Sequence, residues 1–231
     1  TLLLGVAGAL EALGQTVLYV SGEESVLQTK LRALRLGLGA AGIHLLAETQ
    51  LELILETIKQ LKPQCVIIDS VQVLETETLA SAPGSIGQVR SCAQALVRLV
   101  KDESRAGLFL VGHVTKDGFL AGPKVLEHLV DTVLYFEGEP TSGFRVLRST
   151  KNRFGATHEL GVFHMTAEGL VEVPNPSELF LSDRTDAVPG CMVTVSVEGS
   201  RPLLVEIQAM TSPSGMGLPR RRTTGIDFNR L

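Results

Sequence analysis

Apolar residues recur in two different periods along the chain, and together they predict an α/β fold. Cys65-Val66-Ile67-Ile68 is continuously apolar and ends in Asp69 and Ser70, as expected of a strand that helices cover on both faces. Similar runs predict strands at 15–20 and 107–112, and a weaker one at 43–46. Helical spacing of apolar residues predicts helices at 28–36, 51–61 and from Gln88 onward. This alternation predicts a mostly parallel sheet with right-handed crossovers.

A different pattern follows in the second half of the chain. The segments 131–136, 144–149 and 159–165 alternate apolar and polar residues, which predicts an antiparallel edge of the sheet. Two stretches without apolar periodicity, 75–87 and 117–124, predict mobile loops. The leucines of the basic helix, Leu27, Leu31 and Leu34, have the spacing of an ordinary amphipathic surface helix.

Composition and charge narrow the class of protein. The chain has 231 residues and a net charge of −4, so contact with nucleic acid has to come from local basic patches. No apolar run is long enough to span a bilayer and no signal peptide is visible, which favours a cytoplasmic protein without membrane contact. Of the three cysteines, Cys65 and Cys92 fall on apolar faces and are expected to be packed, reduced thiols.

The two ends of the chain read as cuts in a longer protein. Thr1-Leu2-Leu3-Leu4 begins in a helical pattern without a start signal, and the last residues lack a tail-like composition. A helix that begins in this way often follows the Lys-Ser/Thr of a phosphate-binding P-loop, which makes Thr1 a candidate nucleotide-binding residue. The P-loop itself is not in this sequence.

Candidate chemistry gathers at the ends of the predicted strands. In an open α/β sheet, ligands bind beyond the carboxyl ends of the strands, where Asp69 and Ser70 fall. Four apolar residues followed by Asp have the form of a Walker B strand, whose carboxylate holds Mg²⁺; the alternative is a cap of the next helix. Glu23 and Glu24 could polarise an attacking water or simply favour a helix N-terminus.

Four motifs carry a resemblance to a known family. The segments 19–25 (YVSGEES), 66–72 (VIIDSVQ), 113–118 (HVTKDG) and 151–155 (KNRFG) resemble the RadA, or Sms, family of bacterial DNA-repair proteins along essentially the whole chain. The KNRFG motif is close to diagnostic, whereas RecA-like ATPases and replicative helicases share the other three more loosely.

The resemblance implies a domain organisation. Residues 1–182 would form a RecA-like P-loop ATPase core without its first strand and P-loop, and 183–231 the truncated start of an α+β Lon-protease-like domain. Residues 188–210 look like the first hairpin of that domain, with 198–202 as its turn and an exposed apolar face. In the family a four-cysteine zinc motif precedes this region, so Zn²⁺ would bind outside this chain.

The resemblance also implies site residues. Asp69 would help hold Mg²⁺, through water, beside ATP, and Glu23, or failing it Glu24, would orient the hydrolytic water. His113 would sense the γ-phosphate. Lys151 and Arg153, in the motif Lys151-Asn152-Arg153-Phe154-Gly155, would point to one side and enter a neighbouring subunit's nucleotide site, which implies a homo-hexamer.

DNA contact is expected at two places. The loops 75–87 and 115–124 would face DNA, with phosphate-binding charge from Arg90, Lys116 and Lys124, and the basic run Arg220, Arg221 and Arg222 would add a second contact. Ordinary solvated surface loops could have the same composition.

Two classes of function follow from these observations. The first is a DNA-dependent ATPase and helicase that acts with RecA on single-stranded and branched DNA, extending D-loops by branch migration. The second is a non-enzymatic DNA-binding or assembly module, because the chain without its P-loop should bind nucleotide poorly. A RecA-type strand-exchange ATPase is a rival that the KNRFG motif argues against, and no serine–lysine dyad supports a protease.

Overall fold

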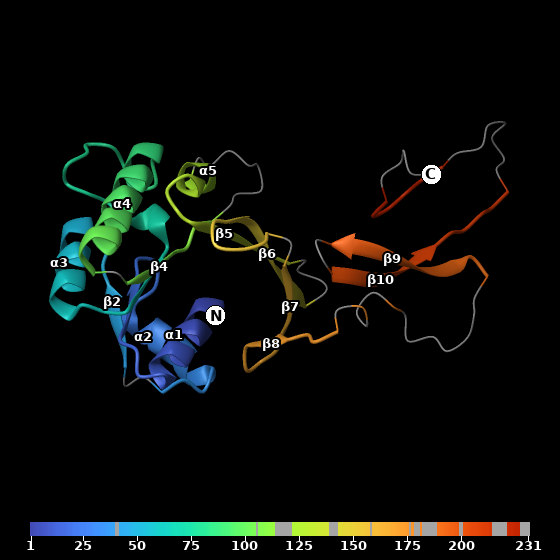
Figure 1. Ribbon diagram of the computed structural model, residues 1–231, viewed down its shortest axis with the longest axis horizontal. Helices are drawn as coiled ribbons and strands as arrows, with labels where there is room; N and C mark the ends of the chain where they lie inside the picture. Colours follow the sequence, from blue (N-terminus) through green and yellow to red (C-terminus); the bar gives the residue numbers. More distant parts are fainter. Residues whose placement is uncertain are drawn as a thin grey trace. The chain divides into compact units, whose positions relative to one another are not determined.

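The computed structural model of the chain describes residues 1–39, 42–104, 106–113, 122–138, 143–157, 159–175, 177, 181, 189–198, 201–213 and 221–226 (Figure 1). The elements, in chain order, are α1 (Leu2–Ala12), β1 (Val17–Ser21), α2 (Val26–Arg35), β2 (Ile43–Ala47), α3 (Leu51–Leu61), β3 (Cys65–Asp69), the 3₁₀ turn η1 (Val71–Val73), α4 (Ile86–Leu99), the π-helical turn η2 (Val100–Ser104), β4 (Gly107–Leu110), α5 (Gly122–Glu127), β5 (Thr132–Glu137), β6 (Phe144–Asn152), β7 (Leu160–Met165), β8 (Leu170–Glu172), β9 (Cys191–Glu198) and β10 (Arg201–Gln208).

The predicted parallel sheet is confirmed. Its strands run in the order β2-β1-β3-β4, all parallel, and every residue of β1 is buried. Alternate residues of the central strands face opposite ways, so Val20 and Ile68 pack with α3 and α4, whereas Val17 and Ile67 pack with α1. Figure 1 shows α3 and α4 on one side of this sheet and α1 and α2 on the other. Coverage of both faces explains why these strands read as continuous apolar runs.

The predicted helices form, but α2 presents its leucines to solvent. A capping box between Ser25 and Gln28 starts the helix, and its buried residues are Thr29 and Ala33. The spacing of the leucines led us to expect an ordinary amphipathic helix, yet Leu27, Leu31 and Leu34 are 65%, 57% and 56% exposed. Apolar spacing identifies a helix face, but only the packing decides whether that face is covered.

The antiparallel strands form a sheet of their own in the described residues. Its order is β5-β6-β7-β8, with antiparallel pairing throughout, so the predicted edge of the parallel sheet is instead a second sheet. Buried Leu126 of α5 joins the core cluster that contains α4. Lys101 Nζ lies 3.5 Å from Asp131 Oδ1, just before β5. These contacts connect the sheet to the helical layer around α4.

The segment between η1 and α4 is irregular, as predicted, but its first part is anchored. Gln88 is 2% exposed, and its side chain accepts a hydrogen bond from the backbone N–H of Thr76. The Gln88 amide donates to the carbonyls of Thr76, Leu79 and Ser81. One buried amide thus satisfies a turn that lacks regular structure, which the expectation of a mobile loop had missed.

The chain divides into two compact units. The first comprises Thr1–Pro174 with Gly199–Arg201, and the second comprises Asn175–Glu198 and Pro202–Leu231. The predicted hairpin is present as the β9–β10 pair, and Val193, Val195 and Val197 are more than half exposed on it. The assignment of this unit to a Lon-like domain stays a prediction. Among the described helices, none has the length and apolarity to cross a bilayer.

Candidate functional site

The candidate site lies at the carboxyl edge of the parallel sheet. Register places Ser21, the last residue of β1, opposite Asp69, the last residue of β3. The chain beyond β4 continues the pairing, because Val111 accepts a hydrogen bond from the backbone of Val71. The strand ends thereby bring Glu23, the Asp69–Ser70 pair and His113 to one edge, as the sequence predicted.

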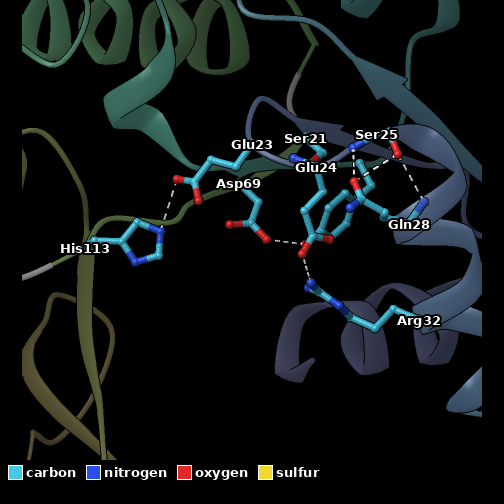
Figure 2. A network of polar contacts seen from close by, with 9 residues as sticks. Ser21, Glu23, Glu24, Ser25, Gln28, Arg32, Asp69 and His113 are labelled. Carbon is cyan, nitrogen blue, oxygen red and sulfur yellow. Dashed lines mark hydrogen bonds and ion pairs between the residues drawn. The ribbon is translucent and has the colours of Figure 1, made fainter.

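Glu23 is the point where three of these segments meet. The hydroxyl of Ser70, which is fully buried, donates to Glu23 Oε1 at 2.5 Å. The Nε2 atom of His113 lies 3.3 Å from the same oxygen. The side chains of His113 and Glu23 are 61% and 44% exposed, so the pair stays open to a ligand (Figure 2). Residues from the ends of β1, β3 and β4 are therefore coupled through one carboxylate.

Glu24 has a different environment. Its carboxylate pairs with Arg32 of α2, and its backbone N–H donates to Ser21 Oγ at 3.1 Å. Figure 2 shows Glu24 toward Arg32 and Glu23 toward His113. The two adjacent glutamates, which the sequence could not separate, thus contact different partners, and only Glu23 contacts Ser70 and His113.

A residue that sequence reasoning missed contacts Asp69. The hydroxyl of Tyr19 donates to Asp69 Oδ2 at 2.5 Å. Burial first, and then this hydrogen bond, raise the pKa of Tyr19 well above its ordinary value. The available signal was a phenol inside an otherwise apolar strand, because a buried Tyr usually finds a partner for its hydroxyl.

The site fits a Mg²⁺-nucleotide better than a structural metal. Within the described residues, no group of three or more His, Cys, Asp or Glu side chains lies close enough to hold a metal ion. Mg²⁺ in nucleotide sites is held by one or two carboxylates, waters and substrate phosphates, and one carboxylate at a strand end, such as that of Asp69, is compatible with such a site. Ser70 uses its hydroxyl on Glu23, and Thr1 is the N-cap residue of α1 without a side-chain cap bond.

A hollow of about 330 Å³ lies beside this cluster. It is lined by the last residues of β1 and β2 and by the residues that follow them, namely Ser21, Gly22, Glu23, Glu24, Ser25, Ala47, Glu48 and Thr49. Asp69 and His113 do not line it. The hollow therefore adjoins the carboxylate cluster through Glu23 and does not by itself mark the nucleotide position.

The segment Lys151–Gly155 is held by a different part of the same unit. Lys151 Nζ donates to the carbonyls of Glu127 and Val130, at 2.5 and 2.8 Å, where α5 ends. Arg153 Nη1 lies 2.9 Å from Asp131 Oδ1. Both cations thus contact one short stretch of chain, and none of the described contacts joins them to Glu23, Asp69 or His113. Phe154 is 83% exposed.

The predicted DNA-contacting residues are scattered in what the structure describes. Arg90 is exposed on α4, and Arg221 and Arg222 are exposed in the second unit. Lys124 belongs to α5, and its side chain lies outside the described part, as do Lys116 and Arg220. The structure therefore does not test the predicted DNA surface.

Known sequences match this chain along its whole length. It is 53% identical over 231 residues to "DNA repair protein RadA" of Bacillus subtilis, covering 100% of this chain and 50% of that protein. The RadA proteins of Brucella abortus and Streptococcus pneumoniae are 53% and 50% identical and are covered over 50% and 54% of their length. The chain thus spans about half the length of these curated relatives. No family model matches.

Two solved structures have a similar fold. One of them, described as an "ATPase Domain", superposes with a TM-score of 0.56 at 13% identity, covering 74% of this chain and 78% of that one. A "KaiC-like protein" from Pyrococcus horikoshii superposes with a TM-score of 0.55 at 16% identity, over 73% of this chain and 80% of that one. The fold is the RecA-like α/β fold of P-loop ATPases, as predicted.

Proposed function

Because the chain belongs over its whole length to the RadA family of bacterial DNA-repair proteins, we propose that it forms the core of an ATP-driven motor that acts on DNA. The observation that carries this proposal is that Ser70 and His113 both contact the same carboxylate oxygen of Glu23, Oε1. Asp69 directly precedes Ser70. RecA-like ATPases bind nucleotide beyond this edge of the sheet.

The residues at the edge have separable roles in hydrolysis. Asp69 would help to hold Mg²⁺, and the bound ion would supply positive charge near the nucleotide's phosphates. Glu23 orients and deprotonates the attacking water, since its exposed carboxylate is fixed by Ser70. His113 senses the γ-phosphate and, through the same oxygen of Glu23, is coupled to the water-activating group.

Lys151 and Arg153 act in a neighbouring subunit. Their described contacts go to Glu127 and Asp131 and not to the carboxylates at the sheet edge, and Phe154, next to Arg153, is exposed; both observations support contact with another copy. An arginine supplied in trans stabilises the transition-state charge of phosphoryl transfer. Such an arrangement requires a ring or a filament, and the family resemblance favours a homo-hexamer. Arg153 would exchange its pairing with Asp131 for the phosphates.

Membership of the family supports a proposal about the activity of the whole protein. We propose that the whole protein is a DNA-dependent helicase of recombinational repair that acts in the cytoplasm, with RecA, on single-stranded and branched DNA. Residues 183–231 are proposed to open a Lon-like DNA-binding domain, to which the exposed Arg221 and Arg222 contribute. Arg90, Lys116 and Lys124 are proposed contacts of the motor core. The competing function is a non-enzymatic DNA-binding or assembly module.

The test uses a protein of the relatives' full length that contains this chain. Arg153→Ala is compared with wild type and with Arg148→Ala, which removes an exposed arginine from β6, the strand that ends just before Arg153. We expect Arg153→Ala to lower DNA-stimulated ATP hydrolysis about 10³-fold and to abolish unwinding of a forked duplex. Lys151→Ala should also lose unwinding, but it removes the cap of α5 as well, so Arg153→Ala is the decisive variant.

Mixed assemblies decide between action in trans and in cis. Asp69→Asn subunits keep an intact Arg153, and Arg153→Ala subunits keep an intact Asp69. If the arginine acts on a neighbour, mixing two inactive variants restores part of the hydrolysis. Inactive mixtures would place the arginine in cis, and full unwinding by Arg153→Ala would remove the motor proposal's most specific support.

A further inference from the structure

Tyr19 is a buried polar residue that the proposed mechanism does not use. It lies in the middle of β1, opposite Ile67 of β3, and is 2% exposed. Its ring packs in the core cluster with Leu4 and Ala7 of α1. The hydroxyl emerges from this apolar layer only at the carboxylate of Asp69, 2.5 Å from Oδ2. In the part of the chain that the structure describes, that carboxylate is the hydroxyl's one hydrogen-bond partner.

The orientation of the Asp69 carboxylate depends on a single contact, whereas that of Glu23 depends on two. Glu23 contacts both Ser70 and His113, whereas the described residues offer the Asp69 carboxylate one hydrogen-bond donor, Tyr19. Oδ1 is left without a hydrogen bond from these residues and can accept one from metal-bound water. A neutral phenol also stabilises the ionised carboxylate without placing a second cation beside the Mg²⁺ site.

We propose that Tyr19 is a positioning residue for the Mg²⁺-binding carboxylate of Asp69. Its hydroxyl holds Oδ2 and thereby fixes the orientation of the carboxylate that would help to hold the ion. The ring is buried in the cluster that includes residues of α1 and of the sheet, so its hydroxyl has a fixed position. This fixed hydroxyl restricts the movement of the Asp69 carboxylate. This inference rests on the proposed nucleotide site and assigns to Tyr19 no contact with substrate.

The experiment measures Mg²⁺-dependent nucleotide binding, because a packing role alone would not change it. In a protein of the relatives' full length, a fluorescent ATP analogue is titrated in EDTA and in excess Mg²⁺. The ratio of the two dissociation constants gives the Mg²⁺ enhancement. Tyr19→Phe keeps the buried ring and removes the hydroxyl. Tyr135→Phe is the matched control, since its phenol donates to the Glu127 carboxylate at 3.1 Å, away from Asp69.

We expect Tyr19→Phe to bind nucleotide in EDTA as wild type does and to lose about tenfold of the Mg²⁺ enhancement, equivalent to about 1.4 kcal/mol. Tyr135→Phe should keep the full enhancement. In the Asp69→Asn background, Tyr19→Phe should change nothing further, because the hydroxyl acts through Asp69. A thermal melt checks that each variant is folded, and the EDTA titration itself reports an intact nucleotide site.

Any of four results would overturn the inference, three of them in the single variants. They are an unchanged enhancement in Tyr19→Phe, an increased enhancement, which would mean that the phenol competes with the ion, and an equal loss in Tyr135→Phe. An additive effect in the double variant would also overturn it, since Tyr19 would then act independently of Asp69. Failure of the proposed function looks different, because wild type itself would then bind no Mg²⁺-nucleotide.

Discussion

The carboxylate cluster and the Lys151–Gly155 segment belong to the same compact unit but are built in opposite ways. Asp69 ends a strand that is buried on both faces, and Glu23 and Ser70 follow such strands. Buried Ser70 and Tyr19 donate hydrogen bonds to the two carboxylates. Lys151 and Arg153 sit at the end of a partly exposed sheet, and their contacts go to the short stretch from Glu127 to Asp131.

This difference shows how one chain can combine a rigid group of residues, the carboxylate cluster, with an adaptable one, the Lys151–Gly155 segment. A group that must meet a reacting atom is best fixed by the core, because small displacements cost catalytic rate. A group that enters another molecule has to exchange its contacts, so weak and exposed partners suit it. Each of the following predictions tests one side of this contrast.

Truncating a side chain in each region should give the largest difference in the free energy of unfolding. Ile67 is fully buried beneath the site, so Ile67→Ala should lower the free energy of unfolding by about 2–5 kcal/mol. Phe154 is 83% exposed, and Phe154→Ala should change the free energy of unfolding by less than about 0.5 kcal/mol. Denaturant unfolding of both variants measures this. A large cost for Phe154→Ala would mean that the Lys151–Gly155 segment is part of the core.

Neutralising each of the two adjacent glutamates should have different effects on the rate of ATP hydrolysis. Glu23→Gln should lower the rate constant of ATP hydrolysis about 10²-fold in the full-length protein, because the oriented base is lost. Glu24→Gln, which removes a partner of Arg32, should lower it less than about threefold. Steady-state hydrolysis under saturating ATP measures both. The opposite ranking would assign the water to Glu24.

High pH should weaken the parallel layer through its buried thiols. Burial raises the pKa of Cys92 from 9.0 to about 11, so the unfolded chain loses this proton first as pH rises. The stability that the neutral thiol contributes is therefore complete below pH 9 and lost by about pH 11. Between these values, wild type should lose on the order of 1–2 kcal/mol more than Cys92→Ala. Denaturation midpoints at several pH values test this, and parallel profiles for the two proteins would refute it.

Removing the partly exposed ion pairs of Asp131 should have the smallest effect on the free energy of unfolding. Asp131→Asn removes the ion pairs with Arg153 and Lys101, which are partly exposed, and should cost less than about 1 kcal/mol. The cost should shrink further in high salt, which screens the wild-type pairs. Asp102→Asn, which removes the exposed pair with Arg98, is the control. A cost of several kcal/mol would show that the segment is fixed as firmly as the carboxylates.

Much of the fold could be predicted because local patterns determined it. Continuous apolar runs marked β1, β3 and β4, and α3 begins and ends at the predicted residues, because strand coverage and helical period leave direct traces in the sequence. The convergence of Glu23, Asp69 and His113 was also predictable, since parallel strands bring their carboxyl ends to one edge.

The sequence by itself determined which residues reach the carboxyl edge, through periodicity and strand order. Only the tertiary structure decided which of them touch: Glu23 rather than Glu24 against Ser70 and His113, Tyr19 on Asp69, and Gln88 holding the turn after η1. It also turned the leucines of α2 outward and separated the antiparallel strands into their own sheet. The physical reason is range: helical and strand periods arise from neighbouring residues, whereas hydrogen bonds between distant segments and the covering of a face depend on how the whole chain packs.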